Sequence, residues 1–297
     1  MILVAGSANL DFVVQASHIP APGETVLGRD FKTYPGGKGA NQAIACARAG
    51  KAATQMLLAL GKDAFSQPIE TSLLAAGVQM HVVRVESQPT GTAFICVSDD
   101  AENAITVAPG ANNALRAEHL PALDGCNHLL LQLETPIETV IAYAREARTR
   151  GVQVVLNAAP ARALPDELIE LLDVLVVNKG ELATVAAHQG SIEQCMQRID
   201  VPCIVVTLGD RGCCARIDGE LIMQDAFAVM PVDTTAAGDT FCGVLVAALD
   251  RGMSMAQALR WANAAGALAC TKHGAQSSIP THAELLEFLS QHPCSNS

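Results

Sequence analysis

Short apolar runs alternate with amphipathic segments over most of the chain. Several of these runs end in a small or polar residue that leads into a helical pattern, namely ILVAGS (2–7), ATQMLLALG (53–61), HLLLQLE (128–134), VQVVLN (152–157), VLVVN (174–178) and CIVVTLG (203–209). Between them, Pro136–Arg150 has apolar residues at helical spacing, basic residues in its final turn and Gly151 after it, which predicts a helix. Near-continuous apolar strands that alternate with helices indicate a parallel sheet buried on both faces.

Two regions do not follow this alternation of apolar strands and helices. Leu10–Phe31 and Gly91–Val107 alternate apolar and polar residues, contain turn residues and show no helical pattern between their strands. This pattern is typical of antiparallel strands in a small separate sheet. We therefore expect one catalytic α/β domain over residues 1–297, with a small β lid built from insertions at about 10–36 and 88–109.

Polar residues follow the ends of the predicted parallel strands. Ligands of open parallel sheets bind beyond the carboxyl ends of the strands, so this edge predicts one cleft for polar groups. The residues concerned are Asn9, Asp11, Glu134, Asn157, Asn178, Glu181, Thr207 and Gly209.

The amino-acid composition of the chain excludes several classes of function. The 297 residues are 50% hydrophobic and carry a formal net charge of −11 with no run of Lys and Arg, which argues against nucleic acid as a partner. The N-terminus has no basic flank, and no apolar stretch approaches the ~18 residues of a membrane span, so we expect a cytoplasmic protein. Ten scattered cysteines without a C-x-x-C pair indicate buried free thiols rather than zinc ligands; they are Cys46, Cys96, Cys126, Cys195, Cys203, Cys213, Cys214, Cys242, Cys270 and Cys294.

The glycine-rich stretch YPGGKGANQA (34–43) suggests a phosphate loop at first sight. A P-loop requires G-x-x-x-x-G-K-[ST], and this stretch lacks both the spacing and the hydroxyl residue. It also fails the dinucleotide pattern G-x-G-x-x-G, because Gln42 stands in the place of the last glycine. An NAD enzyme therefore remains only a weak alternative.

The stretch DTTAAGD (233–239) is a better candidate for an anion site. It precedes the apolar helical run TFCGVLVAAL, and its small residues would leave backbone N–H groups free at a helix N-terminus, where they attract phosphate oxygens. Asp239 beside such a site has two interpretations. It accepts a proton from a hydroxyl nucleophile, or it caps the helix.

These two motifs together resemble the signatures of the ribokinase-like carbohydrate kinases, the PfkB family. Five further segments resemble the family in the same order, namely PAPGETV (20–26), QLETP (132–136), NAAPAR (157–162), TLGDRG (207–212) and KHGAQSSIP (272–280). The resemblance implies a three-layer αβα fold with a mainly parallel central sheet and a small β lid. It also implies ATP as the phosphoryl donor, Mg²⁺ as a cofactor and K⁺ as an activator.

The resemblance assigns residue roles by position. Asp239 resembles the catalytic base and Ala236, Ala237 and Gly238 the anion hole. The sugar-binding positions are Asn9, Asp11, Gly37, Lys38, Asn41, Glu134 and Asp239. The nucleotide positions are Asn178, Thr207, Leu208, Gly209, Asp210, Arg211, Gly212, Gly238 and Asn263, the last standing where the family often has histidine. Glu181 would act on Mg²⁺ indirectly, and a monovalent cation site would involve Asp233, Thr235, Ala269, Lys272, Gly274 and Ser278.

The resemblance implies transfer of the ATP γ-phosphate to the terminal hydroxyl of a pentose, D-ribose first, giving ribose 5-phosphate. Alternatives are deoxyribose, another small sugar or a nucleoside, and a non-enzymatic sugar-binding protein on the same fold. The few aromatic candidates for a nucleobase contact, Phe12, Tyr34 and Phe94, favour a free sugar. The resemblance further implies a homodimer formed through the lid. We also expect the lid to close over bound sugar, because water must be kept from the transferring phosphoryl group.

Overall fold

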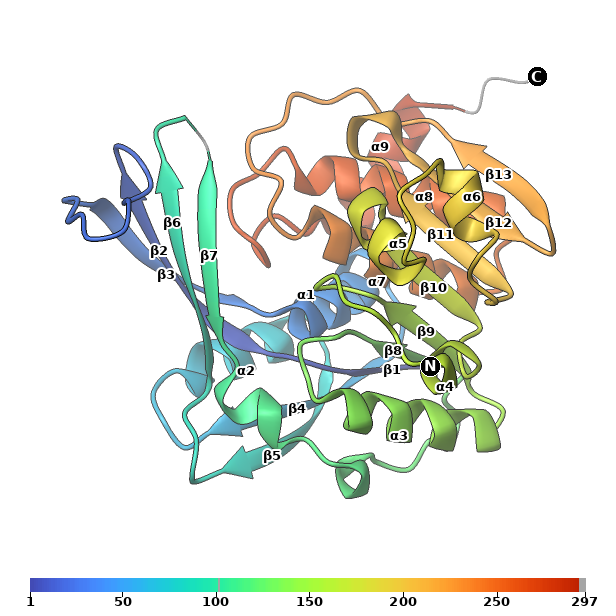
Figure 1. Cartoon of the computed structure of the whole chain (residues 1–297), viewed down its shortest axis with the longest axis horizontal. Coiled ribbons are helices and arrows are strands. Elements are labelled where there is room, and N and C mark those ends of the chain that lie inside the picture. Colours follow the sequence, from blue (N-terminus) through green and yellow to red (C-terminus); the bar gives the residue numbers. More distant parts are fainter. Residues whose placement is uncertain (101, 294–297) are drawn as a thin grey trace.

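The apolar runs form one large sheet (Figure 1). In the computed structural model, which describes residues 1–100 and 102–293, this sheet has nine strands in the order β13-β12-β11-β10-β9-β8-β1-β4-β5. The strands from β11 to β5 are parallel, and β12 and β13 join one edge antiparallel. Their bounds are β1 Ile2–Ala5, β4 Thr54–Gly61, β5 Gln79–Val85, β8 His128–Leu131, β9 Gln153–Asn157, β10 Val174–Asn178, β11 Cys203–Thr207, β12 Cys213–Ile217 and β13 Glu220–Gln224.

Alternate residues of each central strand enter two separate apolar cores. In β1, Ile2 and Val4 pack into one core, while Leu3 and Ala5 pack into the other. The first core is covered by α1 (Lys38–Ile44), the π-helical turn η1 (Ala45–Ala49), α2 (Ser66–Ala75), α7 (Ala237–Asp250), α8 (Met255–Ala269) and α9 (His282–Gln291). The second is covered by α3 (Ile137–Thr149), α4 (Asp166–Ile169), α5 (Lys179–Val185) and α6 (Ile192–Met196). The predicted three-layer αβα fold is confirmed.

The helix predicted over 136–150 is α3, which begins at Ile137 and ends at Thr149. It stops where Gly151 takes a φ of 71°, a left-handed conformation that glycine adopts without a steric penalty. In the part of the chain that the structure describes, three short 3₁₀ turns complete the main elements, η2 (Gly110–Ala114), η3 (Ala117–His119) and η4 (Gly209–Arg211).

A second sheet of four strands projects from the larger body (Figure 1). Its order is β3-β2-β6-β7, with bounds β2 Asn9–Ala16, β3 Arg29–Gly36, β6 Gly91–Ser98 and β7 Asn103–Ala108. The predicted antiparallel strands are present in the pairs β2–β3 and β6–β7, and these two pairs are joined by a parallel pairing of β2 with β6 that the alternation did not indicate. The reason is topological: β2 continues from β1 and β6 follows β5, and both of those strands run in the same direction in the large sheet.

No helix in the described part of the chain is long and apolar enough to cross a membrane. The cysteines placed by the structure are free thiols, and most are buried. Burial raises the pKa of the Cys203 and Cys213 thiols to about 12, which makes both unreactive near neutral pH. Cys294 lies outside the described residues.

Candidate active site

The glycines of the 34–43 motif allow α1 to begin directly against the end of β1. Gly37 has a φ of +89°, and a Cβ there would lie 2.8 Å from Ala8 Cα. A Cβ on Gly39 would lie 2.7 Å from the backbone nitrogen of Ser7. The Ala40 N–H donates to the Ser7 carbonyl at 2.9 Å. These glycines therefore serve a close backbone contact, which points the first turn of α1 at the carboxyl edge of the sheet.

Asp239 lies in the first turn of α7 and is buried. Its Oδ2 accepts a hydrogen bond from Asn41 Nδ2 at 2.9 Å, and its Oδ1 accepts one from Gln42 Nε2 at 3.0 Å. The N-cap of α7 is Ala236, which makes no side-chain capping bond. The Asp239 carboxylate thus contacts α1 instead of capping its own helix, and the two signature motifs meet at this side chain.

A buried chain of amides holds this carboxylate, and the sequence analysis did not include it among the site residues. Gln42 Oε1 accepts from Gln132 Nε2 at 2.6 Å, and Gln42 Nε2 also donates to Asn157 Oδ1 at 3.0 Å. Asn157 Nδ2 donates in turn to the Val176 carbonyl at 3.2 Å. Asn157 was recognisable as a polar strand end, but Gln42 was considered only as the residue that replaces a glycine.

The predicted sugar positions come together from separate elements. Asn9, at the start of β2, is buried, and its Oδ1 accepts from Asn112 Nδ2 at 2.8 Å. Glu134 follows β8, and its Oε2 accepts hydrogen bonds from the Ser7 hydroxyl and, at 3.2 Å, from the Lys38 backbone N–H. Asn112 was not predicted, since nothing in the spacing of the motifs points to it.

Asp11 faces the same region from β2. Burial, together with the nearby charges of Glu134 and Asp239, raises the pKa of its carboxyl group to about 7. Gly36 leaves the room for this carboxyl group, because a Cβ there would lie 2.1 Å from Asp11 Oδ2. Asp11, Glu134 and Asp239 therefore form a cluster of acidic groups close enough to affect one another.

Lys38 is the cation among these acids. The charge of Asp239 raises the pKa of the Lys38 ammonium group, Glu134 and Glu181 add to this effect, and burial opposes it. The side chain lines a cavity of about 170 Å³ together with Ala236, Gly238, Asp239, Asn178, Glu181, Thr207, Asn157, Ala159, Val176, Val177 and Cys242. Residues from the predicted sugar, base, anion-hole and nucleotide sets thus share one cavity.

The N-x-x-E motif forms a capping box at the start of α5. Asn178 Oδ1 accepts from the Glu181 backbone N–H at 2.9 Å, and Glu181 Oε2 accepts from the Asn178 backbone N–H at 2.8 Å. Burial raises the pKa of the Glu181 carboxyl group in spite of this hydrogen bond and of nearby Lys38. The capping box fixes Asn178 and Glu181 at the wall of the cavity.

The predicted anion hole lies at the N-terminus of α7. Ala236 has a φ of 59°, and Gly238 faces open space, since a Cβ there would meet no atom within 4 Å. The Ala237 N–H already donates to the Thr234 carbonyl at 3.2 Å. In this conformation Ala236 and Gly238 line the cavity, whereas the Ala237 N–H is engaged in a turn.

The rest of the predicted nucleotide set lies beyond β11. Gly209, Asp210 and Arg211 form the turn η4, and the Leu208 N–H donates to the Gly212 carbonyl at 2.8 Å. Asn263, on α8, donates from Nδ2 to the Asp225 carbonyl at 2.7 Å and so holds the segment after β13. Thr207, the last residue of β11, lines the cavity around Lys38.

Asp233 connects the predicted cation positions. Its Oδ1 accepts from the Thr235 N–H and its Oδ2 from the Gly274 N–H, both at 2.9 Å. Burial alone would raise the pKa of Asp233, but these hydrogen bonds hold it below its usual value. The segment before α7 is thereby joined to the C-terminal loop, residues 271–280.

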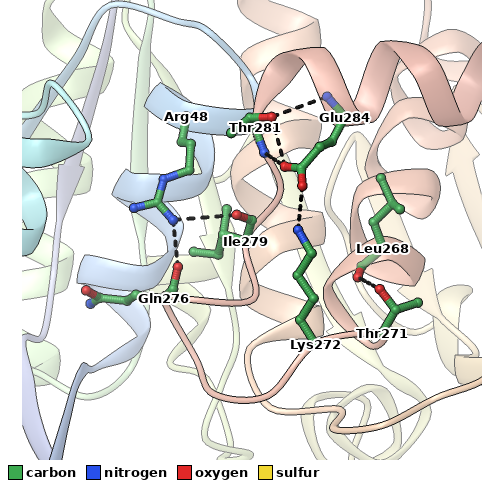
Figure 2. Close-up of polar contacts among 8 residues, drawn as sticks. All are labelled: Arg48, Leu268, Thr271, Lys272, Gln276, Ile279, Thr281 and Glu284. Carbon is green, nitrogen blue, oxygen red and sulfur yellow. Dashed lines mark hydrogen bonds and ion pairs between the residues drawn. The ribbon is translucent and has the colours of Figure 1, made fainter.

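The remaining cation positions lie in or next to this loop. The Lys272 N–H donates to the Ala269 carbonyl at 3.2 Å, and the buried Ser278 hydroxyl donates to the Ala275 carbonyl at 2.8 Å. Figure 2 shows the Lys272 ammonium group turned to Glu284, at 2.6 Å. Among the residues that the structure describes, no group of three or more His, Cys, Asp or Glu side chains is arranged to hold a metal ion.

Known proteins are similar to this chain over nearly its whole length. A family profile described as pfkB family carbohydrate kinase matches residues 1–282. A ribokinase of Haemophilus influenzae is 39% identical, with 97% of this chain and 98% of the relative covered. A deoxyribokinase of Salmonella typhi is 31% identical, with 97% and 98% covered.

The fold is similar to that of a solved structure of Arabidopsis thaliana ribokinase complexed with ribose and ATP. The TM-score is 0.88 at 32% sequence identity, and 97% of each chain is covered. Carbohydrate kinases transfer a phosphoryl group to an alcohol, so the predicted class of enzyme, a phosphotransferase with an alcohol acceptor, is confirmed. The chain belongs to the pfkB family of carbohydrate kinases, as its two signature motifs predicted.

Proposed function

We propose that this protein is an ATP-dependent kinase that transfers the γ-phosphoryl group of ATP to the terminal hydroxyl of D-ribose and forms ribose 5-phosphate. The observation that carries the proposal is the contact of Asp239, at the start of α7, with Asn41 and Gln42 of α1. This contact supports Asp239 as the base, because its carboxylate belongs to the acidic cluster and also lines the cavity around Lys38. The similarity to ribokinases supports ribose as the acceptor.

Asp239 would accept the proton of the attacking hydroxyl. Its two oxygens are held by separate amide donors, so the carboxylate is oriented before the substrate arrives. Lys38 and the open N-terminus of α7 at Gly238 would face the transferring phosphoryl group, whose charge they stabilise. Phosphoryl transfer depends mainly on such positioning and charge stabilisation.

The acidic cluster would hold the sugar. Asn41 Oδ1 is buried and has no hydrogen-bond partner among the described residues, an arrangement that a sugar hydroxyl would complete. Asp11 and Glu134 add acceptors for vicinal hydroxyls, and Asn9 adds a further polar group beside them. A sugar that lacks a matching hydroxyl would leave a buried acceptor unpaired, which is the basis of selectivity here.

The residues present fit Mg²⁺ and a monovalent cation. Glu181 has a half-buried carboxyl group on the cavity wall, a hard oxygen ligand for Mg²⁺ or for the water molecules that Mg²⁺ retains. Bound there, the ion would neutralise phosphate charge. K⁺ would bind near Asp233, which joins the segment before α7 to the C-terminal loop through Gly274, and would stabilise the anion hole.

Transfer to deoxyribose is the second candidate function, because a deoxyribokinase is among the similar proteins. The deciding experiment is ATP consumption by the purified protein with D-ribose, 2-deoxy-D-ribose and a set of nucleosides, with and without K⁺. We expect ribose to have the highest kcat/KM. Faster turnover of deoxyribose or a nucleoside would refute ribose as the substrate, and no turnover with any acceptor would favour a sugar-binding protein without activity.

We also propose that the small sheet is a lid and that two lids pair in a homodimer. Large apolar side chains on this sheet are exposed to solvent, among them Phe31 (62%), Phe94 (54%) and Ile105 (56%). The rings of Phe31 and Phe94 both stack on Phe12 and form a contiguous apolar surface on one face of the sheet. Ile105, in contrast, pairs with Ile95 on the other face. An exposed apolar surface of this kind is typical of a protein interface. Sedimentation of the wild type and of Phe31→Asp tests the proposal, since the variant should be monomeric if the sheets pair through the face that carries Phe31.

A further inference from the structure

Three buried side-chain atoms in the described residues have no hydrogen-bond partner: Asn41 Oδ1, Gln132 Oε1 and Gln276 Nε2. The first two belong to the network around Asp239. Gln276 lies in the C-terminal loop, outside the cavity around Lys38. A buried donor without an acceptor is costly, so its presence points to a partner that completes it.

Gln276 lines a second cavity, of about 180 Å³. Its side chain is only 4% exposed, and its Oε1 accepts from the Ser72 hydroxyl at 2.6 Å, which leaves Nε2 as the unpaired donor. The other residues of the wall are Tyr34, Pro35, Arg48, Ser72 and Ser277. The cavity therefore lies between β3, η1, α2 and the C-terminal loop.

Arg48 supplies a positive charge to this cavity. One of its terminal nitrogens, Nη1, donates to the carbonyl groups of Gln276 at 2.7 Å and Ile279 at 3.5 Å. The guanidinium group makes no ion pair with any carboxylate that the structure describes, and burial lowers its pKa. The nearby carboxylate of Glu284 is already paired with Lys272, as Figure 2 shows.

We propose that this cavity, between Arg48 and Gln276, is a binding site for a phosphate group, either inorganic phosphate or the phosphate of a small phosphomonoester. Arginine is the preferred residue for phosphate oxygens, because its planar fork of donors matches their geometry. In Figure 2 the free end of the guanidinium group and the side chain of Gln276 extend to the same side of the loop. The unpaired Gln276 Nε2 adds a neutral donor beside the cation.

A ligand in this cavity would influence the active site through the C-terminal loop. Gly274, two residues before Gln276, donates to Asp233 Oδ2, and the Asp233 N–H donates to the Cys270 carbonyl at 3.2 Å. Asp233 leads directly into the predicted anion hole. A phosphate group that fixes Gln276 would therefore order the loop that holds the start of α7. This regulatory site shares no wall residue with the cavity around Lys38 and does not depend on which sugar is phosphorylated.

The test is calorimetric titration of inorganic phosphate and, separately, of glycerol 3-phosphate into the whole protein saturated with a non-hydrolysable ATP analogue. The analogue fills the phosphate positions of the active site. We expect one site in the wild type, and at least about tenfold weaker binding in Gln276→Glu, whose carboxylate repels the anion, and in Arg48→Met. Arg145→Met is the matched control, because Arg145 pairs with Glu167 on a distant surface, and its phosphate affinity should not change.

Hydrogen exchange separates the proposed role from a general loss of structure. Phosphate should slow amide exchange in residues 271–280 of the wild type and of Arg145→Met, but not of Gln276→Glu. Tighter binding of one of the two probes would identify the source of the phosphate group. Absence of saturable binding in the wild type, or equal affinity in the wild type, Gln276→Glu and Arg48→Met, would overturn the proposal.

Discussion

Gln42 Nε2 lies 3.0 Å from Asp239 Oδ1 and donates a hydrogen bond to it, although 197 positions separate the two residues in the sequence. The Gln42 amide faces one way, because an ionised carboxylate only accepts and so requires the Nε2 side, which leaves Gln42 Oε1 to accept from Gln132 Nε2. Its donor side is thereby directed at the carboxylate. Asp239 is thus held by α1 through both Gln42 and Asn41, which makes the sugar-side motif part of the apparatus that orients the candidate base.

Replacement of Gln42 by Leu should lower kcat for ribose about 10- to 100-fold and change the KM for ribose much less, because the carboxylate loses an orienting donor. It should also destabilise the protein by about 2 kcal/mol, since Asn157 Oδ1 and Gln132 Nε2 lose their partner. Steady-state kinetics and urea unfolding measure the two effects. Gln42→Glu keeps the size but places a carboxylate against Asp239, and it should lower kcat at least as much. A folded Gln42→Leu variant with wild-type kcat would contradict a positioning role.

Replacement of Gly37 by Ala should destabilise the protein by about 3 kcal/mol or more, because the new Cβ meets the backbone of Ala8 and the positive φ is unfavourable. Gly77 is the matched control. Its φ is +78°, but a Cβ there meets nothing within 4 Å, so Gly77→Ala should cost only about 1 kcal/mol. Urea unfolding compares the two variants. Equal losses would show that the close approach to Ala8 does not matter.

The layered fold was predictable because a strand that is buried on both faces of a sheet consists almost entirely of apolar residues. VLVVN and CIVVTLG, which form β10 and β11, are such segments. The parallel pairing of β2 with β6 was not predictable from alternation, which indicates strands but does not identify their partners. For a related reason, the sequence pattern did not identify three residues of the site, Gln42, Gln132 and Asn112. Their hydrogen bonds join segments about one hundred residues apart, and no local spacing encodes such a contact. Asn178 with Glu181 did carry a local signal, that of a capping box.

Ribose binding should release protons near neutral pH. The pKa of Asp11 is about 7 in the free protein, so its carboxyl group is largely protonated at pH 6. Sugar hydroxyls that donate to Asp11 favour its ionised form and lower its pKa, so ribose affinity should rise between pH 5 and 7 and level off above. Calorimetry in buffers with different ionisation enthalpies counts the protons. Asp11→Asn should abolish the release; unchanged proton release in this variant would assign the effect to another group.

The Asp11 carboxyl group should also make the free energy of unfolding depend on pH. This free energy should fall as pH rises, whereas ribose affinity rises. The folded-state pKa of Asp11, about 7, lies above the ordinary aspartate value of 3.8, so folding favours the protonated form. Its favourable contribution is complete below pH 3.8 and is lost as pH rises through 7. Relative to the wild type, Asp11→Asn should therefore gain about 2–4 kcal/mol in the free energy of unfolding between pH 4 and pH 8. A difference between the two proteins that does not vary with pH would contradict this burial of an acidic group.

Replacement of Asp239 by Asn tests the central claim most directly, because the amide keeps the shape of the side chain but cannot accept the proton of the attacking hydroxyl. Ribose-dependent ATP consumption and calorimetric ribose binding should be measured on the same preparation of the wild type and of Asp239→Asn. We predict that kcat falls by at least about 10³-fold while the dissociation constant for ribose changes less than about tenfold. Turnover within a few-fold of the wild type would contradict the role of Asp239 as the base.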